Sequence, residues 1–288
     1  MIHRKVCVVM FYILYNEKSK HGKAVKVAAK LHKKISKKEE ARLCSVFDIL
    51  GREKEYIAKL NPEDKVVIIG GDGTFHQFVN AIKPNKVNCR IFALASGTGN
   101  DFSRDYNKKK MFEITHLVND LPLLTINNEK EYVFLNGAGI GVDSLVCYEQ
   151  EQAMKKFEKT SYFKVALKVI KNFKPYTLDL TVDGKLHHFE NVWFFVCNNG
   201  RYFGGGMKIT PKAVREDDLL DVCIVHNIKV RKLIFILPTV FLGWHVMFKK
   251  HVSIIRGKHI IADPNGGCDV LQCDGEVSIG VDKIEVRR

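Results

Sequence analysis

No Cys-x-x-Cys pair occurs in the 288-residue sequence, although it contains eight cysteines. No Cys/His spacing resembles a zinc site either, which excludes the common structural zinc folds. Several cysteines stand inside apolar runs, such as Cys7 in VCVVM and Cys197 in WFFVC, where a thiol behaves as a small buried hydrophobic group. We therefore expect free core thiols in a soluble, cytoplasmic protein, because the cytoplasm keeps thiols reduced.

Long hydrophobic segments are also lacking. No small-residue cleavage site follows the apolar run at residues 6–14, so this run predicts a buried first strand rather than a secretory signal. The run at residues 233–248 is shorter than the roughly 20 residues of a membrane-spanning helix, and it contains Pro238 and Gly243. We expect it to form a buried or interfacial helix.

Acidic residues are outnumbered by basic ones, 32 against 46, which gives a net charge of +14. Such a chain is attracted to polyanions, including nucleotide phosphates and anionic lipids. Part of the charge forms a stripe at helical spacing, made of Lys23, Lys26, Lys30, Lys33 and Lys37. We favour a solvated helix face as its interpretation, with an anionic membrane surface as the alternative. Nucleic acid is not an expected partner, since no aromatic residues interleave with these lysines.

Low-complexity linkers and internal repeats are absent, and the length of the chain suits two domains. Residues 1–125 alternate apolar runs with helical patterns, which predicts an α/β domain with an open, mostly parallel sheet. The predicted strands are residues 6–14, 43–47, 65–69 and 90–95, and the predicted helices are residues 22–35, 52–60 and 75–82.

Short strand-like runs broken by Gly, Asn and Asp dominate residues 126–288. Residues 177–182 alternate cleanly and lead into Asp183-Gly184, a hairpin turn signal. Further strands are predicted at residues 192–197, 220–225, 254–255, 259–262 and 277–279, with helices at 154–173 and 233–248. This pattern predicts a mainly antiparallel β-sandwich domain, and we expect its last residues to pack back on the first domain.

Two familiar nucleotide motifs, G-x-x-x-x-G-K-[ST] and G-x-G-x-x-G, are missing. Instead, residues 70–74 (GGDGT) join a predicted buried strand directly to a predicted helix. Glycines let the backbone come close to a ligand, and amides at a helix N-terminus attract phosphate oxygens. A carboxylate beside phosphate calls for a cation, so Asp72 indicates Mg²⁺-dependent phosphoryl transfer; a Gly-rich turn capped by Asp is the structural alternative.

A second loop, Gly97-Thr98-Gly99-Asn100-Asp101, also follows a predicted strand and precedes a predicted helix. Junctions in consecutive β–α units lie on the same edge of a parallel sheet, so we expect the two loops to be neighbours. Thr98 and the loop amides could then hold phosphate oxygens, while Asn100 and Asp101 could cap the helix instead.

These loops, together with FLNGAGIGVDSLV, TSYFKVALKVI, NNGRYFGGGMKITPKAVREDDLLDV and QCDGEVSIG, resemble the diacylglycerol kinase catalytic-domain family. This family includes bacterial lipid kinases, sphingosine kinases and ceramide kinases. The resemblance runs through almost the whole chain, with its segments in family order. It implies a first domain like that of NAD kinase and phosphofructokinase. It also implies ATP- and Mg²⁺-dependent phosphorylation of a hydroxyl of diacylglycerol or a related lipid, giving a phospholipid such as phosphatidic acid.

The resemblance implies roles for particular residues. Glu276 of Asp274-Gly275-Glu276 matches the general base that takes the proton of the lipid hydroxyl. Asp143 joins Asp72, Asp274 and Glu276 in the implied catalytic set, with a core-edge or capping role as its structural alternative. On the residues alone, Asp274-Gly275-Glu276 is a hairpin turn with an exposed acid. Asp72 is placed near Mg²⁺. The residues implied in ATP binding are Asn16, Gly70, Gly71, Asp72, Gly73, Thr74, Phe75, His76, Gln77, Gly97, Thr98, Gly99 and Asn100.

A second, structural Mg²⁺ is implied in the β domain, with Asp217 as ligand and the carbonyls of Val214 and Leu219 nearby. The family's glycine in this segment is Asp218 here, a residue type that tolerates left-handed backbone. Other departures concern the nucleotide. The first loop (residues 16–23) lacks a proline and a glycine, Phe47 stands where the family often has a threonine, and Gln77 replaces a glutamate.

Two other functions fit parts of this pattern. A GGDGT kinase of a water-soluble substrate, such as an NAD kinase, would share the first loop but not GTGNDFSR and GGGMKITPKA. A nucleotide or lipid sensor without turnover would explain the departures but not the presence of both Asp72 and Glu276. The expected partner is a lipid substrate at a membrane surface, with the protein peripheral on the inner face, and open sheet edges make a homodimer a further expectation.

Overall fold

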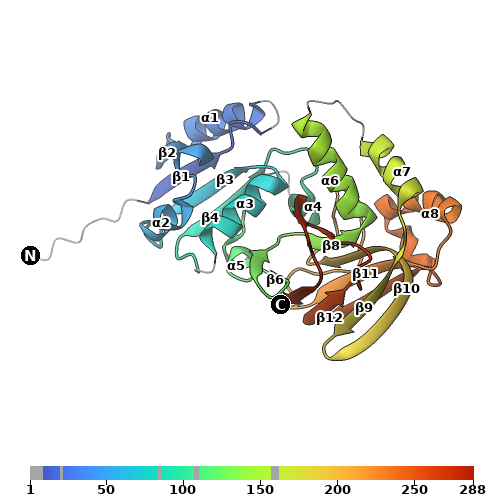
Figure 1. Ribbon diagram of the computed structural model, residues 1–288. Coiled ribbons are helices and arrows are strands. Elements are labelled where there is room, and N and C mark those ends of the chain that lie inside the picture. Colours follow the sequence, from blue (N-terminus) through green and yellow to red (C-terminus); the bar gives the residue numbers. More distant parts are fainter. Residues whose placement is uncertain (1–8, 20–21, 84–85, 107–109, 157–161) are drawn as a thin grey trace, which may run out of the picture. The chain divides into compact units, whose positions relative to one another are not determined.

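The structure is a computed structural model that describes residues 9–19, 22–83, 86–106, 110–156 and 162–288 (Figure 1). The chain divides into two compact units, Met1–Asp120 and Leu121–Arg288. The sequence placed this boundary after residue 125. Residues 121–125 lie in the second unit because they lead into β6 (Leu123–Ile126), which pairs with strands near the end of the chain.

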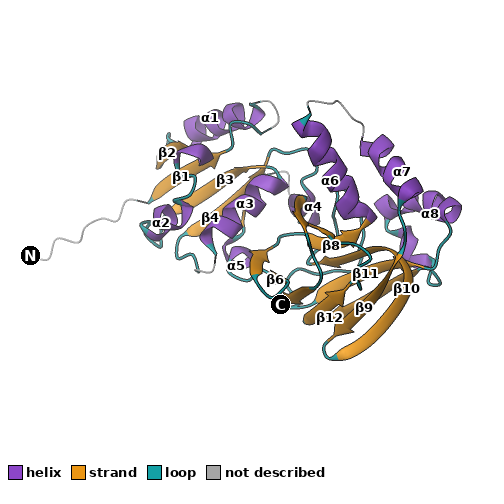
Figure 2. Cartoon of the chain, viewed as in Figure 1, coloured by secondary structure: helices purple, strands orange, loops and turns teal. Residues whose placement is uncertain are grey.

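The first unit contains a five-stranded sheet in the order β2-β1-β3-β4-β5. All its neighbouring strands are parallel except β4 and β5, so the predicted open, mostly parallel sheet is confirmed. Its elements are β1 (Met10–Tyr15), α1 (Lys23–Ile35), β2 (Glu40–Ser45), the 3-10 helix η1 (Val46–Asp48), α2 (Glu53–Ala58), β3 (Lys65–Gly70), α3 (Asp72–Ile82), β4 (Arg90–Ala95), α4 (Asp101–Asp105), β5 (Phe112–Glu113) and α5 (Thr115–Val118) (Figure 2).

The sheet is buried on both faces. In β3, Val67 and Ile69 pack with Ala24 and Ala28 of α1 on one face, while alternate residues of the strand point to the other. The small alanines let α1 lie close to the sheet, and the predicted lysine stripe of this helix is exposed to solvent. This alternation explains why a near-continuous apolar run forms a central parallel strand.

The strand order creates a switch point in the sheet. The chain leaves β1 towards β2 on one side and leaves β3 towards β4 on the other, while β1 and β3 are neighbours. In open α/β sheets, ligands bind beyond the carboxyl ends of the strands at such a point. Here the loops after β1 and β3, which begin at Asn16 and Gly71, flank it.

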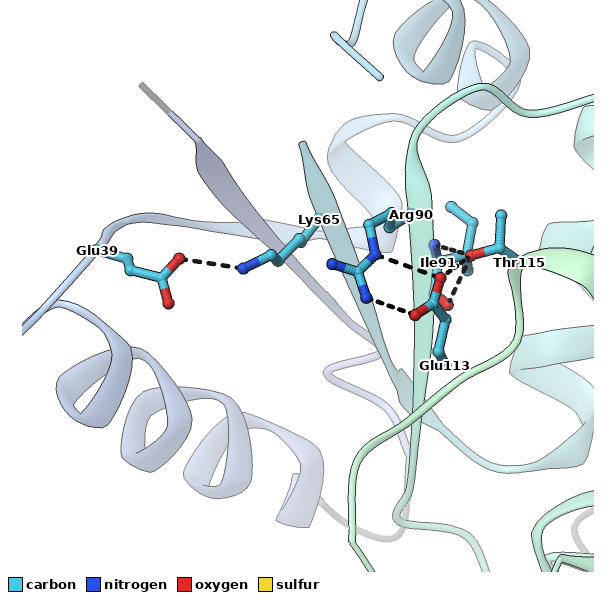
Figure 3. A network of polar contacts seen from close by, with 6 residues as sticks. All are labelled: Glu39, Lys65, Arg90, Ile91, Glu113 and Thr115. Carbon is cyan, nitrogen blue, oxygen red and sulfur yellow. Dashed lines mark hydrogen bonds and ion pairs between the residues drawn. The ribbon is translucent and has the colours of Figure 1, made fainter. Parts of the chain in front are cut away.

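The opposite edge of this sheet is held by ion pairs at the amino ends of the strands. Arg90 makes two hydrogen bonds to the Glu113 carboxylate, of 3.3 and 2.6 Å, and Lys65 lies 3.2 Å from Glu39 (Figure 3). Thr115 adds bonds to Glu113 and to the backbone of Ile91. This network ties β4 to β5 and α5 at the edge away from the glycine loops, so its role is structural.

The second unit contains an 11-stranded sheet with the path β15-β14-β8-β10-β9-β13-β16-β6-β7, from which β11 and β12 branch at β10. Its strands are β6, β7 (Lys130–Val133), β8 (Gly137–Gly141), β9 (Tyr176–Val182), β10 (Lys185–Asn198), β11 (Leu220–His226), β12 (Val252–Gly257), β13 (His259–Asp263), β14 (Val270–Cys273), β15 (Glu276–Ile279) and β16 (Ile284–Arg287). Its helices are α6 (Val142–Lys155), α7 (Tyr162–Asn172), α8 (Val230–Ile236) and the 3-10 helices η2 (Leu237–Leu242) and η3 (Trp244–Met247).

All strand pairs of this unit are antiparallel, as predicted. The sheet curls around one core, since Leu124, Phe195 and Val270 from distant strands belong to the same buried cluster. The long strand β10 pairs with β9 over its first part and with β8 and β11 over its last part, and its register against β9 shifts between Phe189 and Val192. The last strand, β16, lies inside this sheet between β13 and β6, so the final residues, predicted to pack back on the first domain, pair within the second unit.

Several predicted elements differ from the observed ones. The helix predicted at residues 154–173 is two helices, α6 and α7, and the one predicted at 233–248 is α8 followed by η2 and η3, because Pro238 and Gly243 interrupt it. The second strand ends at Ser45, after which η1 begins. Part of the first predicted strand lies outside the described residues. No helix in the described parts of the chain is long and apolar enough to cross a membrane.

The thiols are as expected where the structure describes them. Seven cysteines are free, and five of them are buried. Burial raises the pKa of Cys223 to about 12 and that of Cys89 to about 11. Cys7 lies outside the described residues.

Candidate active site

The two glycine loops of the first unit lie in contact at the carboxyl edge of the parallel sheet. Gly70 and Ala95, the last residues of β3 and β4, are register partners, and the N–H of Ser96 donates to the carbonyl of Gly70 at 2.7 Å. A Cβ on Gly97 would lie only 2.6 Å from the Cα of Gly71. The expectation that both loops share one edge is therefore confirmed, and glycine is needed where their backbones touch.

The N-cap of α3 is a glycine. The first helical hydrogen bond runs from the N–H of Phe75 to the carbonyl of Gly71, and the N-cap residue Gly71 has no side chain that could cap this end. A Cβ on Gly73 would meet nothing within 4 Å. Helix amides at such an end, together with the helix dipole, form a site for phosphate oxygens.

Asn16, at the end of β1, is tied to this helix end. Its backbone N–H donates to the carbonyl of Ile69 at 3.3 Å, and its side-chain Nδ2 donates to Oγ1 of Thr74 at 3.0 Å. The structure thus brings Asn16 and Thr74, both of which the sequence assigned to nucleotide binding, together at the switch point. Within the altered first loop, Lys20 and His21 lie outside the described residues.

Asp72 joins the two loops. Its two carboxylate oxygens accept the backbone N–H groups of Asp101 at 3.0 Å and Phe102 at 3.2 Å, at the start of α4. These bonds fix the carboxylate and stabilise its charge, while a carboxylate has about four lone-pair sites in all. Asp72 therefore caps α4 and places a carboxylate between the two loops.

The other predicted nucleotide residues fall into two groups. Thr98 and Gln77 are exposed, whereas Phe75 and His76 are 1% and 4% exposed. The ring of Phe75 packs on Phe102, and the His76 ring lies 3.4 Å from the amide of Asn80. Both side chains are buried, so a contact of Phe75 or His76 with ATP would have to come from the backbone. The pattern of a loop motif does not show which of its side chains enter the core.

Two further loop residues close turns. Asn100 has left-handed backbone with φ of 53°, and its side chain donates to the carbonyl of Gly97 at 2.9 Å. Phe47, which stands in place of a threonine, is half-buried in η1 with the Lys18 ammonium 4.7 Å from the centre of its ring. Both residues shape the edge of the site without offering a hydroxyl to it.

In the second unit, Asp274 and Gly275 form a tight turn between β14 and β15, with φ of 50° and 95°. The Asp274 carboxylate accepts the N–H groups of three consecutive residues, Leu135, Asn136 and Gly137, at 2.6 to 3.1 Å. Such a saturated carboxylate holds the chain in place, so the geometry favours a positioning role for Asp274 over the predicted catalytic one. Glu276, which follows the turn, is exposed.

Asp143 lies inside the second unit at the start of α6. Its Oδ2 accepts a 3.1 Å bond from the Gln272 amide, and Oδ1 has no partner among the described residues. Because the carboxyl group is buried, its pKa is raised to about 7, and the Gln272 bond offsets only part of this effect. Gln272 also accepts the N–H of Gly275 at 3.0 Å, so one amide links Asp143 to the turn before Glu276.

A buried polar network that the sequence did not reveal supports the same turn. Arg215 is 3% exposed, and its guanidinium donates to Oδ1 of Asn136 at 2.7 Å and to the carbonyl of Leu135. Asn199 contacts this segment too, with a 2.8 Å bond from its N–H to the carbonyl of Asn136. The consecutive asparagines at the end of β10, Asn198 and Asn199, were the only local signal, since every partner lies far away in sequence.

The residues implied for a second magnesium ion are already paired with one another. The N–H of Leu219 donates to Asp217 at 3.1 Å, and the N–H of Asp217 donates to the carbonyl of Val214 at 3.3 Å. The other Asp217 oxygen pairs with the guanidinium of Arg256, whose Nε lies 3.2 Å from the buried Asp221. In the described parts of the chain no group of three or more His, Cys, Asp or Glu could hold a metal.

These residues do not fit a divalent ion, because Arg256 already supplies the positive charge. The turn itself is present without its glycine, since Asp218 adopts left-handed backbone with φ of 55°.

Comparisons with known proteins agree with the two units. The diacylglycerol kinase catalytic domain model matches residues 10–123, and the model of the YegS C-terminal NAD kinase beta sandwich-like domain matches residues 137–284. The second match alone spans more than half of the chain. The chain belongs to the diacylglycerol kinase catalytic-domain family. It is a diacylglycerol kinase-like phosphotransferase, a lipid kinase by family.

Individual relatives span most of this lipid kinase. A diacylglycerol kinase of Mycobacterium tuberculosis is 28% identical over 263 residues, covering 86% of this chain and 82% of the relative. A diacylglycerol kinase of Bacillus subtilis is 24% identical over 227 residues, covering 76% and 73%. A crystal structure of a diacylglycerol kinase from Bacillus anthracis has a TM-score of 0.65 at 16% identity, covering 99% of this chain and 96% of that chain. The last likeness shows the shared fold.

Proposed function

We propose that this lipid kinase transfers the γ-phosphoryl group of ATP, with Mg²⁺, to the hydroxyl of diacylglycerol or a related lipid, giving a phospholipid such as phosphatidic acid. The observation that carries the proposal is the edge of the parallel sheet, where two glycine loops touch beside a carboxylate and a helix N-terminus with a glycine N-cap. Phosphoryl transfer depends mainly on holding phosphates and neutralising their charge. The amides of this edge would hold the phosphates, and a Mg²⁺ at Asp72 would neutralise their charge.

The first unit has the groups that MgATP requires. The N-terminus of α3 offers amides to phosphate oxygens, and nothing described within 4 Å would obstruct an approach over Gly73. Exposed Thr98 and the side chain of Asn16 add polar groups, and we assign the carboxylate of Asp72, which stands between the two loops, to Mg²⁺. A bound Mg²⁺ would neutralise negative charge on the transferred group.

Glu276 is the residue we assign to the acceptor. A general base must be free to take a proton, and its side chain is exposed at the start of β15. Asp274, Gln272 and Asp143 hold the turn that precedes it. We assign these three residues to positioning, which leaves Glu276 as the base that takes the proton of the lipid hydroxyl.

The direct test offers the purified protein ATP and Mg²⁺ with diacylglycerol in mixed micelles and, separately, with NAD. We expect labelled phosphatidic acid, and we expect Asp72→Asn and Glu276→Gln each to lower kcat by 10²-fold or more while the fold stays intact. Glu216→Gln, a change at an exposed carboxylate, is the matched control. Label only in NADP would reject the lipid acceptor, and full activity of Glu276→Gln would reject the assigned base.

We also propose that the protein works peripherally on the inner face of a membrane, because its acceptor resides there.

The acceptor is identified by incubating the protein with a pool of lipids, ATP and Mg²⁺, and detecting newly formed phospholipids by mass spectrometry.

A further inference from the structure

The exposed aromatic side chains of this protein are concentrated in one short stretch. Among the residues whose side chains the structure describes, which leave out Phe163, every exposed Phe or Trp lies between residues 235 and 247, where Leu242 and Met247 are exposed as well. The exposed fractions are 72% for Phe235, 54% for Phe241, 58% for Leu242, 56% for Trp244 and 69% for Met247. We call these five side chains the apolar surface.

The apolar surface does not result from a loosely packed segment. Leu233 and Ile236 of α8 are buried in a cluster with Trp193, and Val240 of η2 is buried in another. In η3, His245 is 1% exposed and its Nε2 lies 2.8 Å from the carbonyl of Ile209. The three helices are therefore anchored by one side, and the opposite side is apolar too.

An ordinary surface helix places polar residues on its outer side. Here the outward positions hold large apolar groups, and such a surface on a folded protein marks a site of interaction. Folding alone gives no reason for these side chains to be apolar.

Charge identifies the partner. The stretch from residue 229 to residue 250 contains no Asp or Glu, and five basic residues bracket the apolar surface: Lys229, Arg231, Lys232, Lys249 and Lys250. All five are exposed. Aromatic and aliphatic side chains flanked by exposed basic residues are the pattern of segments that lie in the interface of an anionic bilayer.

We propose that the apolar surface on α8, η2 and η3 inserts into the interface of an anionic membrane, with the five basic residues at the level of the lipid head groups. None of these helices spans the bilayer, since α8 has 7 residues and η2 has 6. The inference rests on the proposed function for the reason that a lipid kinase needs a membrane. Its own evidence is the exposure and charge of this segment.

The two tryptophans of the chain provide a selective probe. Trp193 is 4% exposed and donates to the carbonyl of Ile228 at 3.0 Å, whereas Trp244 belongs to the apolar surface. In Trp193→Phe, the emission therefore reports Trp244 alone. We expect a blue shift with vesicles of equimolar phosphatidylcholine and phosphatidylglycerol, and quenching by lipids with brominated acyl chains. An unshifted, unquenched emission with vesicle-bound protein would overturn the proposal.

Matched variants separate the apolar contribution from the charged one. Phe241→Ser and Trp244→Ser should each weaken vesicle binding about tenfold. Leu186→Ser removes a side chain that is 65% exposed in β10 and should leave binding unchanged. Lys249→Gln and Lys250→Gln should each weaken binding to anionic vesicles about fivefold and leave binding to zwitterionic vesicles unaltered. Equal loss in Leu186→Ser and Trp244→Ser would contradict the assignment.

Two further readouts distinguish the alternatives. If light scattering shows a dimer that Trp244→Ser dissociates, and vesicles are not bound, the surface joins two copies of this chain and the proposal fails.

Turnover of a water-dispersed short-chain diacylglycerol should be the same for wild type and Trp244→Ser. Vesicle binding through Trp244 without any lipid turnover would overturn the proposed function alone; turnover on vesicles with Trp244 in water would overturn this inference alone.

Discussion

Asp143 shows how a single buried carboxyl group makes stability depend on pH. Burial raises its pKa from 3.8 to about 7. Between these values the unfolded chain is ionised at this residue while the folded chain keeps the proton, so the unfolded state binds fewer protons. The contribution of the neutral acid to stability is fully present below about pH 4 and is lost as the pH rises through about 7.

The Asp143→Asn variant removes this titration. Relative to wild type, we expect its free energy of unfolding to rise between about pH 4 and pH 7, by up to ~1.4 kcal/mol per pH unit, and to level off above that range. Urea unfolding at a series of pH values measures the difference. Asp282→Asn, a change at an exposed carboxylate, shows how much of the trend comes from surface charge in general. A difference between wild type and Asp143→Asn that stays constant across this range would contradict the assignment.

Arg256 is the second residue for which the structure predicts a specific effect on stability. Its guanidinium faces Asp217 and the side chain of Asp221, which is 2% exposed. Arg256→Met leaves these carboxylates without a counter-charge, and we expect a loss of about 1–3 kcal/mol. In the absence of nucleotide, Mg²⁺ or Ca²⁺ should raise the Tm of this variant and have a smaller effect on wild type.

Lys258→Met, in the same part of the chain and exposed, is the control for a lost positive charge. If wild type gains as much Tm from Mg²⁺ as Arg256→Met does, a divalent ion binds beside Arg256 and the guanidinium does not replace it.

At the scale of the elements, the proposed phosphate site lies at the junction of β3, the glycine loop and α3. A glycine on this junction and one on the neighbouring loop after β4 differ in their surroundings: a Cβ on Gly97 would lie 2.6 Å from the backbone of Gly71, whereas a Cβ on Gly73 would meet nothing within 4 Å. This contrast separates the packing of the loops from the space that a phosphate would use.

Gly97→Ala should force the loops apart and destabilise the protein by about 1–3 kcal/mol. Gly73→Ala should leave the stability unchanged or raise it by up to about 1 kcal/mol, because alanine favours the helix. Its methyl group, however, occupies the side from which we expect phosphate to approach, so the KM for ATP should rise. Thermal unfolding and steady-state kinetics on both variants test this. A stable Gly73→Ala variant with unaltered KM would place the phosphates elsewhere.

The elements that the sequence predicted correctly are those with a local signal. β3 and β4 are apolar runs of strand length, and the GGDGT and GTGND loops carry their chemistry within five residues. Strand β8 was not predicted, because three of its five residues are glycines, which have low strand propensity. They are required by packing: a Cβ on Gly139 would lie 2.2 Å from the side chain of Val196.

Roles that depend on distant partners were also beyond the sequence. Asp274 binds residues about 140 positions earlier in the chain, and Arg215 contacts Leu135 and Asn136. No spacing rule connects such residues. The motif therefore predicted the turn at Asp274 and Gly275 correctly, while the positioning role that we propose for Asp274 comes from its hydrogen bonds.

At the scale of the whole molecule, the net charge of +14 should govern how fast the protein reaches an anionic membrane. Electrostatic attraction between exposed charges is screened over a Debye length of about 10 Å at 0.1 M salt. Insertion of the apolar surface follows contact and depends little on salt. We therefore expect the association rate with phosphatidylglycerol vesicles to fall steeply with NaCl, and the dissociation rate to change much less.

Stopped-flow emission of Trp244 in the Trp193→Phe background measures both rates. Because the charge is spread over the chain, with a lysine face on α1 as well as the residues around the apolar surface, Lys249→Gln should lower the association rate by no more than the fivefold loss expected for its binding. Trp244→Phe keeps an aromatic ring but removes the probe, so its binding is followed by co-sedimentation. A dissociation rate that rises with salt as steeply as the association rate falls would mean that charge alone holds the protein on the membrane, and that the aromatic side chains contribute nothing.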